Sequence, residues 1–213
     1  MGLGLTTLIV NLFLPNPRRR RAVAGAFARA FLRTARIPFT VQGAERLPQT
    51  PCVVVANHSS YIDGIIAIAA LPPDFAFVIK KEMVRVPLVG LLLRGLGSEF
   101  VERFDRHKGA SDARRVLRVA ATGQSLVFFP EGTFDEHRRI GKFLAGAFAT
   151  AQRSAMPVVA MAIHGTQDVL PPGSAMIYRR PVRVEILAVI EATEAGQRSR
   201  ELIAAAVGQP LEL

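Results

Sequence analysis

The sequence predicts one α/β domain with a mostly parallel β-sheet flanked by helices. From residue 38 onward, short apolar runs rich in β-branched residues alternate with longer segments of helical spacing. Such an alternation is typical of parallel strands joined by helices. The 213 residues suffice for one domain with a sizeable core, and no internal repeat or low-complexity linker divides them.

The predicted strands are brief and apolar, and the predicted helices are longer. The run Cys52–Ala56 is short and dominated by valine, which favours a buried strand, whereas Gly64–Leu71 is rich in alanine and isoleucine, which favours a helix. The same criteria predict strands at 39–42, 52–56, 75–79, 98–101, 125–129, 157–163 and 182–190. They predict helices at 61–70, 87–95, 109–122, 140–154 and 193–206.

The N-terminal segment differs from the rest of the chain. Residues 1–14 are apolar and uncharged, and the run Arg18–Arg21 follows them. Fourteen residues are fewer than the ~20 that span a bilayer, and a signal peptide carries its basic cluster before the apolar stretch. Residues 22–36 predict an amphipathic helix. We therefore expect residues 1–37 to form a membrane-associating helical arm, with a helix packed on its own domain as the alternative, ahead of the α/β domain at 38–213.

Composition narrows the class of ligand. The formal net charge is +10, the isoelectric point is about 11.1, half of the residues are hydrophobic and the mean hydropathy is +0.27. A basic, apolar-rich chain favours anionic lipid surfaces or phosphorylated substrates. Nucleic acid is not an expected partner, because tryptophan is absent and no nucleic-acid motif is present. The single Cys52 excludes an internal disulfide and a cysteine-based metal cluster.

A candidate catalytic pair lies at the first predicted strand-to-helix turn. His58 and Asp63 are five positions apart, which would place them about 140° apart around one regular helix. If His58 stays in the turn and Asp63 begins the helix, the carboxylate can fold back onto the imidazole. A histidine held by a carboxylate is an oriented general base. The alternative is that His58 and Asp63 only cap the helix.

Polar residues also follow other predicted strands. Glu102 and Arg103 follow one strand, Pro130–Thr133 follow a second, and His164–Thr166 follow a third. The carboxyl ends of parallel strands meet at one edge of a sheet, which is where ligands bind in open α/β folds. We expect these groups to converge with His58 at that edge.

These motifs together resemble the glycerolipid acyltransferases typified by bacterial 1-acylglycerol-3-phosphate acyltransferase. The resemblance runs from about residue 38 to 190, in the order that the family has. It is carried by Asn57-His58 with Asp63, Val78–Met83 with Pro87 and Gly90, Phe100–Arg103, Phe129–Thr133 and Val158–Ile163.

The resemblance implies an O-acyltransferase that moves a fatty acyl group from acyl-CoA or an acylated acyl carrier protein to the free hydroxyl of a lysophospholipid. The first expected acceptor is 1-acylglycerol-3-phosphate, which would give phosphatidic acid. His58 would be the base and Asp63 its orienting carboxylate. No metal or resident cofactor is expected, and the expected location is the cytoplasmic face of the cell membrane, held peripherally or monotopically on an anionic surface.

The resemblance also implies a set of substrate-binding residues. Arg103 and Lys80 would hold the acceptor phosphate, and Glu131 would bind acceptor hydroxyls or order its turn. The full predicted set is Asn57, Lys80, Arg103, Glu131, Gly132 and Thr133. The sequence departs from the family at Phe134, where an Arg or Ser often stands, and this weakens the case for lysophosphatidic acid. Arg138 or Arg139 are candidates to compensate.

Three alternatives remain open from the sequence. The acceptor is another lysolipid, such as a lyso-ornithine lipid. A metal-dependent hydrolase would use His58, Asp63 and Glu131 as ligands, although no second histidine stands at metal-binding spacing. A non-enzymatic membrane-surface protein would use only the basic arm.

Overall fold

The computed structural model describes residues 14–102, 106–133 and 138–212. Arg103, Phe134 and most of the predicted N-terminal apolar segment lie outside the described residues. What we expected of them stays a prediction.

The described part of the chain forms one sheet with the strand order β1-β7-β6-β2-β5-β3-β4. Its strands are β1 (Phe39–Gln42), β2 (Val53–Ala56), β3 (Phe75–Lys80), β4 (Glu99–Val101), β5 (Ser125–Phe128), β6 (Val158–His164) and β7 (Val182–Ile190). All neighbouring pairs are parallel except β6 and β7, which are antiparallel. The prediction of a mostly parallel sheet in a single α/β domain is confirmed.

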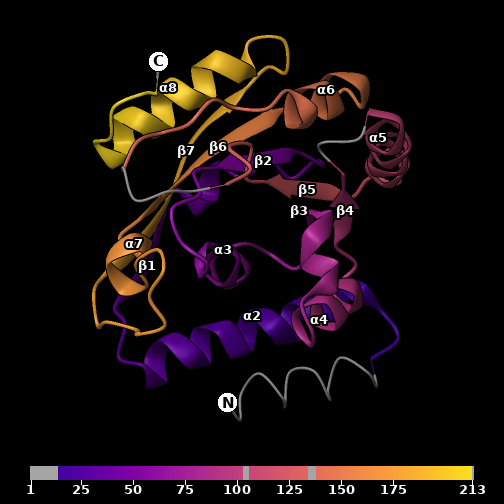
Figure 1. Ribbon diagram of the computed structural model, residues 1–213. Coiled ribbons are helices and arrows are strands. Elements are labelled where there is room, and N and C mark those ends of the chain that lie inside the picture. Colours follow the sequence, from indigo (N-terminus) through magenta and orange to yellow (C-terminus); the bar gives the residue numbers. More distant parts are fainter. Residues whose placement is uncertain (1–13, 103–105, 134–137, 213) are drawn as a thin grey trace.

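Helices cover both faces of this sheet (Figure 1). They are α2 (Pro17–Thr34), α3 (Asp63–Ala70), α4 (Val89–Gly95), α5 (Arg106–Ala121), α6 (Gly146–Arg153), α7 (Thr166–Val169) and α8 (Ala195–Val207), with short 3-10 turns η1 (Ala44–Arg46) and η2 (Lys81–Arg85). One apolar core lies between the sheet and α2 with α3, and a second lies between the sheet and α5, α6 and α8.

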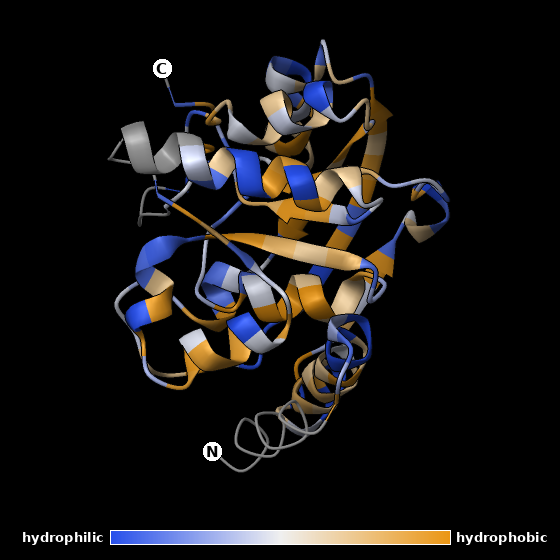
Figure 2. Cartoon of the chain, turned by 90° about the vertical axis from the view of Figure 1, so that its right-hand side faces the viewer, coloured by the Kyte–Doolittle hydropathy of each residue, from blue (hydrophilic) through white to orange (hydrophobic). Residues whose placement is uncertain are grey.

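The alternation of side chains along β2 supplies both cores. Val54 and Ala56 belong to the core under α2 and α3, whereas Val53 and Val55 belong to the core on the opposite face. All four residues are fully buried. Figure 2 shows the central strands coloured as predominantly hydrophobic along their length. A strand buried on both faces reads as a continuous apolar run, which is why Cys52–Ala56 was recognisable in the sequence.

The predicted elements correspond to observed ones with small shifts at their ends, apart from the helix expected at 140–154. α6 begins only at Gly146, and residues before it are not helical. Ile140 instead forms a parallel bridge with Leu211, and the Gly141 N–H donates to Glu131. These tertiary partners replace the i to i−4 bonds that a first helical turn would make.

α2 packs against the domain, contrary to a free membrane arm. Ala28 and Leu32 of α2 lie in the core with α3, at 7% and 2% exposure. Phe31 is half-buried and packs against the same core. Val23 and Phe27 are also half-buried and form a second apolar stripe beside the packed face. The alternative of a helix packed on its own domain is therefore correct for the inner face of α2, while its membrane contact stays a prediction.

The basic run in the first turns of α2 also contacts the domain. Arg18 forms an ion pair with Asp74, and Arg20 donates to the Gly95 carbonyl oxygen at 3.1 Å. Arg21 is 7% exposed and donates to Gln124 at 3.0 Å. These arginines thus fix the start of α2 as well as adding charge. Within the described residues, no helix has the length and apolar character needed to cross a bilayer.

Replacing Leu32 with alanine should lower the free energy of unfolding by about 2–5 kcal/mol, because it empties a closed part of the core. Val23→Ala on the half-buried stripe is the control and should cost about 1 kcal/mol or less. Chemical denaturation of the full chain measures both. Equal, small effects would show that α2 does not contribute to the domain core.

Candidate active site

His58 and Asp63 meet at the carboxyl end of β2. His58 Nδ1 lies 2.8 Å from Asp63 Oδ2, and the Asp63 side chain is completely buried. Asp63 is the first residue of α3, so its carboxylate folds back onto a turn that precedes the helix. The predicted geometry is present. Because Nδ1 faces Asp63, Nε2 is the ring nitrogen that can act on a substrate.

The same carboxylate oxygen organises the whole turn. Asp63 Oδ2 also accepts from the Ser59 N–H at 2.7 Å and from the Ser60 N–H at 2.8 Å. One buried oxygen therefore fixes both the backbone of the turn and the orientation of the His58 ring. Ser59 and Ser60 contribute to this arrangement through their backbone N–H groups.

Side chains of the turn also bind β6 and α7. The Asn57 amide donates to the Ile163 carbonyl oxygen at 2.9 Å and accepts from the Ile163 N–H at 2.8 Å. Ser59 Oγ lies 3.0 Å from Thr166 Oγ1, and Ser60 Oγ donates to the Leu170 carbonyl oxygen at 2.7 Å. His58 is thereby held on a turn that is bonded on two sides.

Glu131 holds His58 from a third direction. Its Oε1 accepts from the His58 N–H at 2.8 Å, and its Oε2 accepts from the Gly141 N–H at 2.7 Å. A Cβ at Gly141 would lie 3.2 Å from Oε2, so a larger residue would crowd this bond. Burial raises the pKa of the Glu131 carboxyl, opposed by the two N–H donors.

A polar cavity of about 280 Å³ opens beside His58. Glu131 and Thr133 line it, and three cationic side chains project from the following segment: Arg138, Arg139 and Lys142. Arg138 has a left-handed backbone, with φ of 45°, a conformation that costs free energy and is often found at functional sites. These three cations outnumber the two carboxylates of the same cavity, Glu131 and Glu212, so the polar side of the site favours an anion.

A separate, apolar cavity has a volume of about 300 Å³. Phe129 lines this cavity, and its ring centroid is 4.7 Å from that of His58. Val78, Val101, Phe128 and Leu144 form much of the remaining wall. His58 thus lines the polar cavity and contacts Phe129, a wall residue of the apolar one.

Residues 38–164, which contain the His58 turn and the Glu131 turn, match the family model described as Acyltransferase. The chain belongs to the acyltransferase family.

Several relatives of this chain carry specific names. It is 32% identical over 184 residues to a chloroplastic 1-acyl-sn-glycerol-3-phosphate acyltransferase of Brassica napus, covering 81% of this chain and 53% of that protein. It is 31% identical over 184 residues to a lyso-ornithine lipid O-acyltransferase of Pseudomonas aeruginosa, covering 82% of this chain and 67% of that protein. The chain spans about half the length of the plant relatives.

A solved structure shares the fold of this chain. The 1-acyl-sn-glycerophosphate acyltransferase PlsC from Thermotoga maritima superposes with a TM-score of 0.78 at 22% sequence identity. The match covers 96% of this chain and 87% of that one. The architecture of the sheet and its helical layers is thus shared.

The residues predicted to bind substrate occupy different positions in the structure. Thr133 is exposed and lines the polar cavity. Asn57, which we expected to bind substrate, is 1% exposed and forms two hydrogen bonds with Ile163. It therefore positions the turn and does not face the cavity. Lys80 is the last residue of β3 and lines neither the polar nor the apolar cavity. Arg103 lies outside the described residues, so its phosphate contact stays a prediction.

The turn after β5 is built differently from our expectation. The Gly132 N–H donates to the Phe129 carbonyl oxygen at 3.1 Å within its own turn, where φ of Gly132 is 78°. Its predicted contact with a substrate anion would have to compete with that bond. Both Glu131 oxygens accept backbone N–H groups, which favours the ordering role over contact with acceptor hydroxyls.

The sequence did not identify Lys142 as part of the site, although Arg138 and Arg139 were candidates. The sequence feature that could have identified Lys142 is its position shortly after the Pro-Glu-Gly-Thr turn. Lys142 reaches the cavity of His58, however, only because the segment before α6 is not helical. Across the described residues, no group of three or more His, Cys, Asp or Glu side chains is arranged to hold a metal ion.

Glu131→Gln should lower the free energy of unfolding by about 1–3 kcal/mol, because an amide NH₂ replaces one acceptor and leaves a buried N–H unsatisfied. Glu212→Gln, at an exposed carboxylate on the same cavity, should change it by less than about 0.5 kcal/mol. Denaturant titrations of the two variants and the wild type provide the comparison.

The raised pKa of Glu131 predicts how the stability of the protein depends on pH. Its folded pKa lies above the ordinary 4.5, so the folded state binds the proton more tightly than the unfolded state. The contribution of this carboxyl to stability should therefore fall as the pH rises from about 4.5 through the folded pKa. Glu131→Gln should remove that slope, and an unchanged slope would contradict the assignment.

Proposed function

We propose that this protein transfers an acyl group from an acyl-thioester to the free hydroxyl of a lysolipid. The observation that carries the proposal is the His58–Asp63 pair, whose imidazole lines a basic polar cavity and contacts Phe129, a wall residue of an apolar cavity. Membership of the acyltransferase family supports the reaction class. The names of the relatives supply the candidate acceptors.

The geometry suits direct attack by the acceptor hydroxyl. His58 Nε2 takes the hydroxyl proton as the oxygen attacks the thioester carbonyl carbon, while Asp63 holds Nδ1–H and stabilises the imidazolium. The new C–O bond forms, the C–S bond breaks, and the imidazolium returns the proton to the leaving thiolate. A positioned base of this kind contributes about 10²–10⁴ in rate. The chain needs no cofactor of its own for this step.

The two cavities support different parts of the substrates. The aromatic and aliphatic walls around Phe128, Phe129 and Val101 suit the fatty acyl chain. Arg139 and Lys142 suit a phosphate or carboxylate on the acceptor, close to the attacking hydroxyl. We therefore propose 1-acylglycerol-3-phosphate as the first acceptor to test, with phosphatidic acid as its product, and a lyso-ornithine lipid as the second.

His58→Ala and Asp63→Asn should each lower kcat by about 10²–10⁴, because one removes the base and the other removes its negative orienting partner. His164→Ala is the matched control, since its imidazole lies beside Arg183 and Glu185. Product formation from lysolipids and acyl-thioesters is followed by mass spectrometry, with circular dichroism confirming the fold.

Three outcomes separate the competing functions. Full activity of purified His58→Ala would refute the base assignment. Activity that depends on added divalent metal and is lost in EDTA would favour the hydrolase alternative. Vesicle binding by a wild-type protein that consumes no thioester would favour the non-enzymatic membrane protein.

Exposed apolar side chains support docking of the protein on a membrane surface. Tyr61, Leu88 and Met176 are each more than 60% exposed, and Leu91 is 50% exposed. Leu88 projects from a strained turn in which the Val89 N–H donates to the Pro87 carbonyl oxygen at 2.7 Å, with φ of 61°. Such side chains, with a net charge of +10, suit an anionic lipid interface.

Leu88→Asp should weaken binding to vesicles that contain anionic lipids several-fold, because it places a charge where a hydrocarbon contact is proposed. Val189→Asp is the control, since Val189 is also exposed but lies near the end of β7 away from the site. Co-sedimentation with vesicles measures both. Equal binding by the two variants and the wild type would remove Leu88 from the proposed membrane contact.

A further inference from the structure

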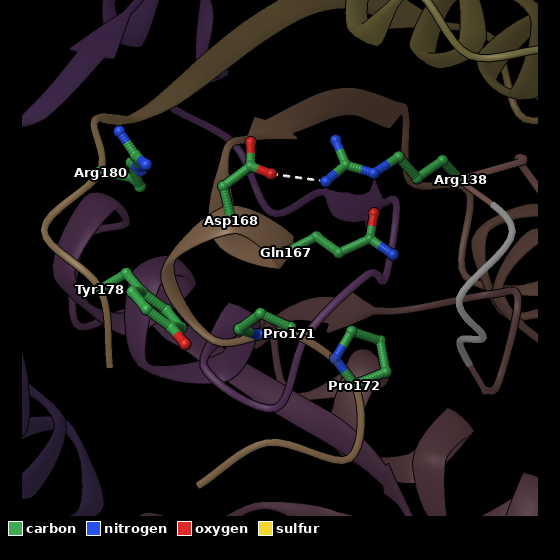
Figure 3. Close-up of a pocket in the computed structure, with 7 residues that line it drawn as sticks. All are labelled: Arg138, Gln167, Asp168, Pro171, Pro172, Tyr178 and Arg180. Carbon is green, nitrogen blue, oxygen red and sulfur yellow. Dashed lines mark hydrogen bonds and ion pairs between the residues drawn. The ribbon is translucent and has the colours of Figure 1, made fainter. Parts of the chain in front are cut away.

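A second and larger polar cavity lies next to the one that contains His58. Its volume is about 780 Å³, within the range of about 300–1,000 Å³ that ligand pockets occupy. Figure 3 shows it between α7, the segment that carries Arg138, and the chain from Pro171 to Arg180 that leads into β7. Nothing in the proposed chemistry has yet used this space.

The two polar cavities share a wall. Arg138 and Gln167 line both of them. The guanidinium of Arg138 forms an ion pair with Asp168 Oδ1 at 2.5 Å, and Figure 3 shows this pair across the cavity from Tyr178 and Pro171. A ligand in the outer cavity would therefore lie directly beside the space in which His58 acts.

The outer cavity has an unbalanced positive charge. The charge of Asp168 is offset by Arg138, whereas Arg180 makes no ion pair within the described part of the chain. The backbone around Arg180 is fixed, because the Tyr178 N–H donates to the Val169 carbonyl oxygen at 2.8 Å and the Arg180 N–H donates to that of Tyr178 at 3.0 Å. A guanidinium and an aromatic ring that line the same cavity suit a phosphate ester.

The inner polar cavity and the apolar cavity are small for two substrates. Acyl transfer brings a thioester donor and a lysolipid acceptor to His58 at the same time. The inner polar cavity holds about 280 Å³ and the apolar cavity about 300 Å³. Both are at or below the lower end of the range for one drug-sized ligand, so the adjoining outer cavity offers room for the polar remainder of a substrate.

We propose that the outer cavity binds the phosphate-bearing portion of a substrate, with Arg180 as the anion-binding side chain and Tyr178 as a wall against the adjoining organic group. This inference rests on the proposed acyl transfer. Two sources share the chemistry: the phosphorylated nucleotide of a CoA donor and the phosphate headgroup of the acceptor.

The test compares Arg180→Ala with Arg179→Ala. Arg179 is the exposed neighbour, carries the same charge and lines neither polar cavity. Calorimetry measures binding of adenosine 3′,5′-bisphosphate and of glycerol 3-phosphate to the full chain, and kinetics measure KM for acyl-CoA and for the acceptor. Arg180→Ala should weaken one ligand and raise the matching KM by about tenfold, the scale of a 1.4 kcal/mol contact. Arg179→Ala should change neither.

The two sources give different patterns. Loss of adenosine 3′,5′-bisphosphate binding with a raised KM for acyl-CoA assigns the cavity to the donor, and loss of glycerol 3-phosphate binding with a raised KM for the acceptor assigns it to the acceptor. Asp168→Asn should tighten whichever ligand binds, because it removes the opposing negative charge. Unchanged binding in Arg180→Ala, or the same change in Arg179→Ala, overturns the proposal.

The proposed function fails independently of this inference. A wild-type protein that turns over no pair of thioester and lysolipid refutes acyl transfer, while the calorimetric comparison of the two arginine variants still decides whether the cavity binds a phosphate ester.

Discussion

A single buried oxygen, Asp63 Oδ2, accepts from the His58 ring and from the backbone N–H groups of Ser59 and Ser60. Charge-assisted bonds of this kind are stronger than neutral ones, and here they fix a backbone turn and a side-chain orientation together. The functional ring cannot move without disturbing the turn. This turn connects β2, the central strand, directly to α3. The site is therefore held by the rigid core of the domain.

Glu131 extends this arrangement to the next strand. By accepting the N–H groups of His58 and Gly141, it connects the end of β2 to the turn after β5 and to the extended segment before α6. That segment brings Lys142 to the polar cavity, while Phe129, just before the Glu131 turn, contacts the His58 ring. One carboxylate thereby sets the spacing between the base and the walls on either side of it, at the cost of keeping a charge largely buried.

Much of this could be predicted from the chain, because the informative patterns are local. A valine run such as Val53–Val55 is apolar at every position only if both of its faces are buried, and parallel strands then place their carboxyl ends at one edge. The same reasoning failed where a residue's role depends on distant partners. Asn57 forms hydrogen bonds with Ile163, which lies more than one hundred positions away in the sequence. Ile140 forms a bridge with Leu211, and residues 140–145 are not part of the helix.

The sequence by itself determined the α/β class, the positions of the strands and the pairing of His58 with Asp63, because each depends on periodicity or on a spacing of a few residues. Only the tertiary structure decided that the inner face of α2 packs on the domain, that Glu131 supports the backbone of His58, and that Arg138 pairs with Asp168 between two polar cavities. Those features depend on contacts between residues that are far apart in the sequence, and a local sequence pattern does not specify such contacts.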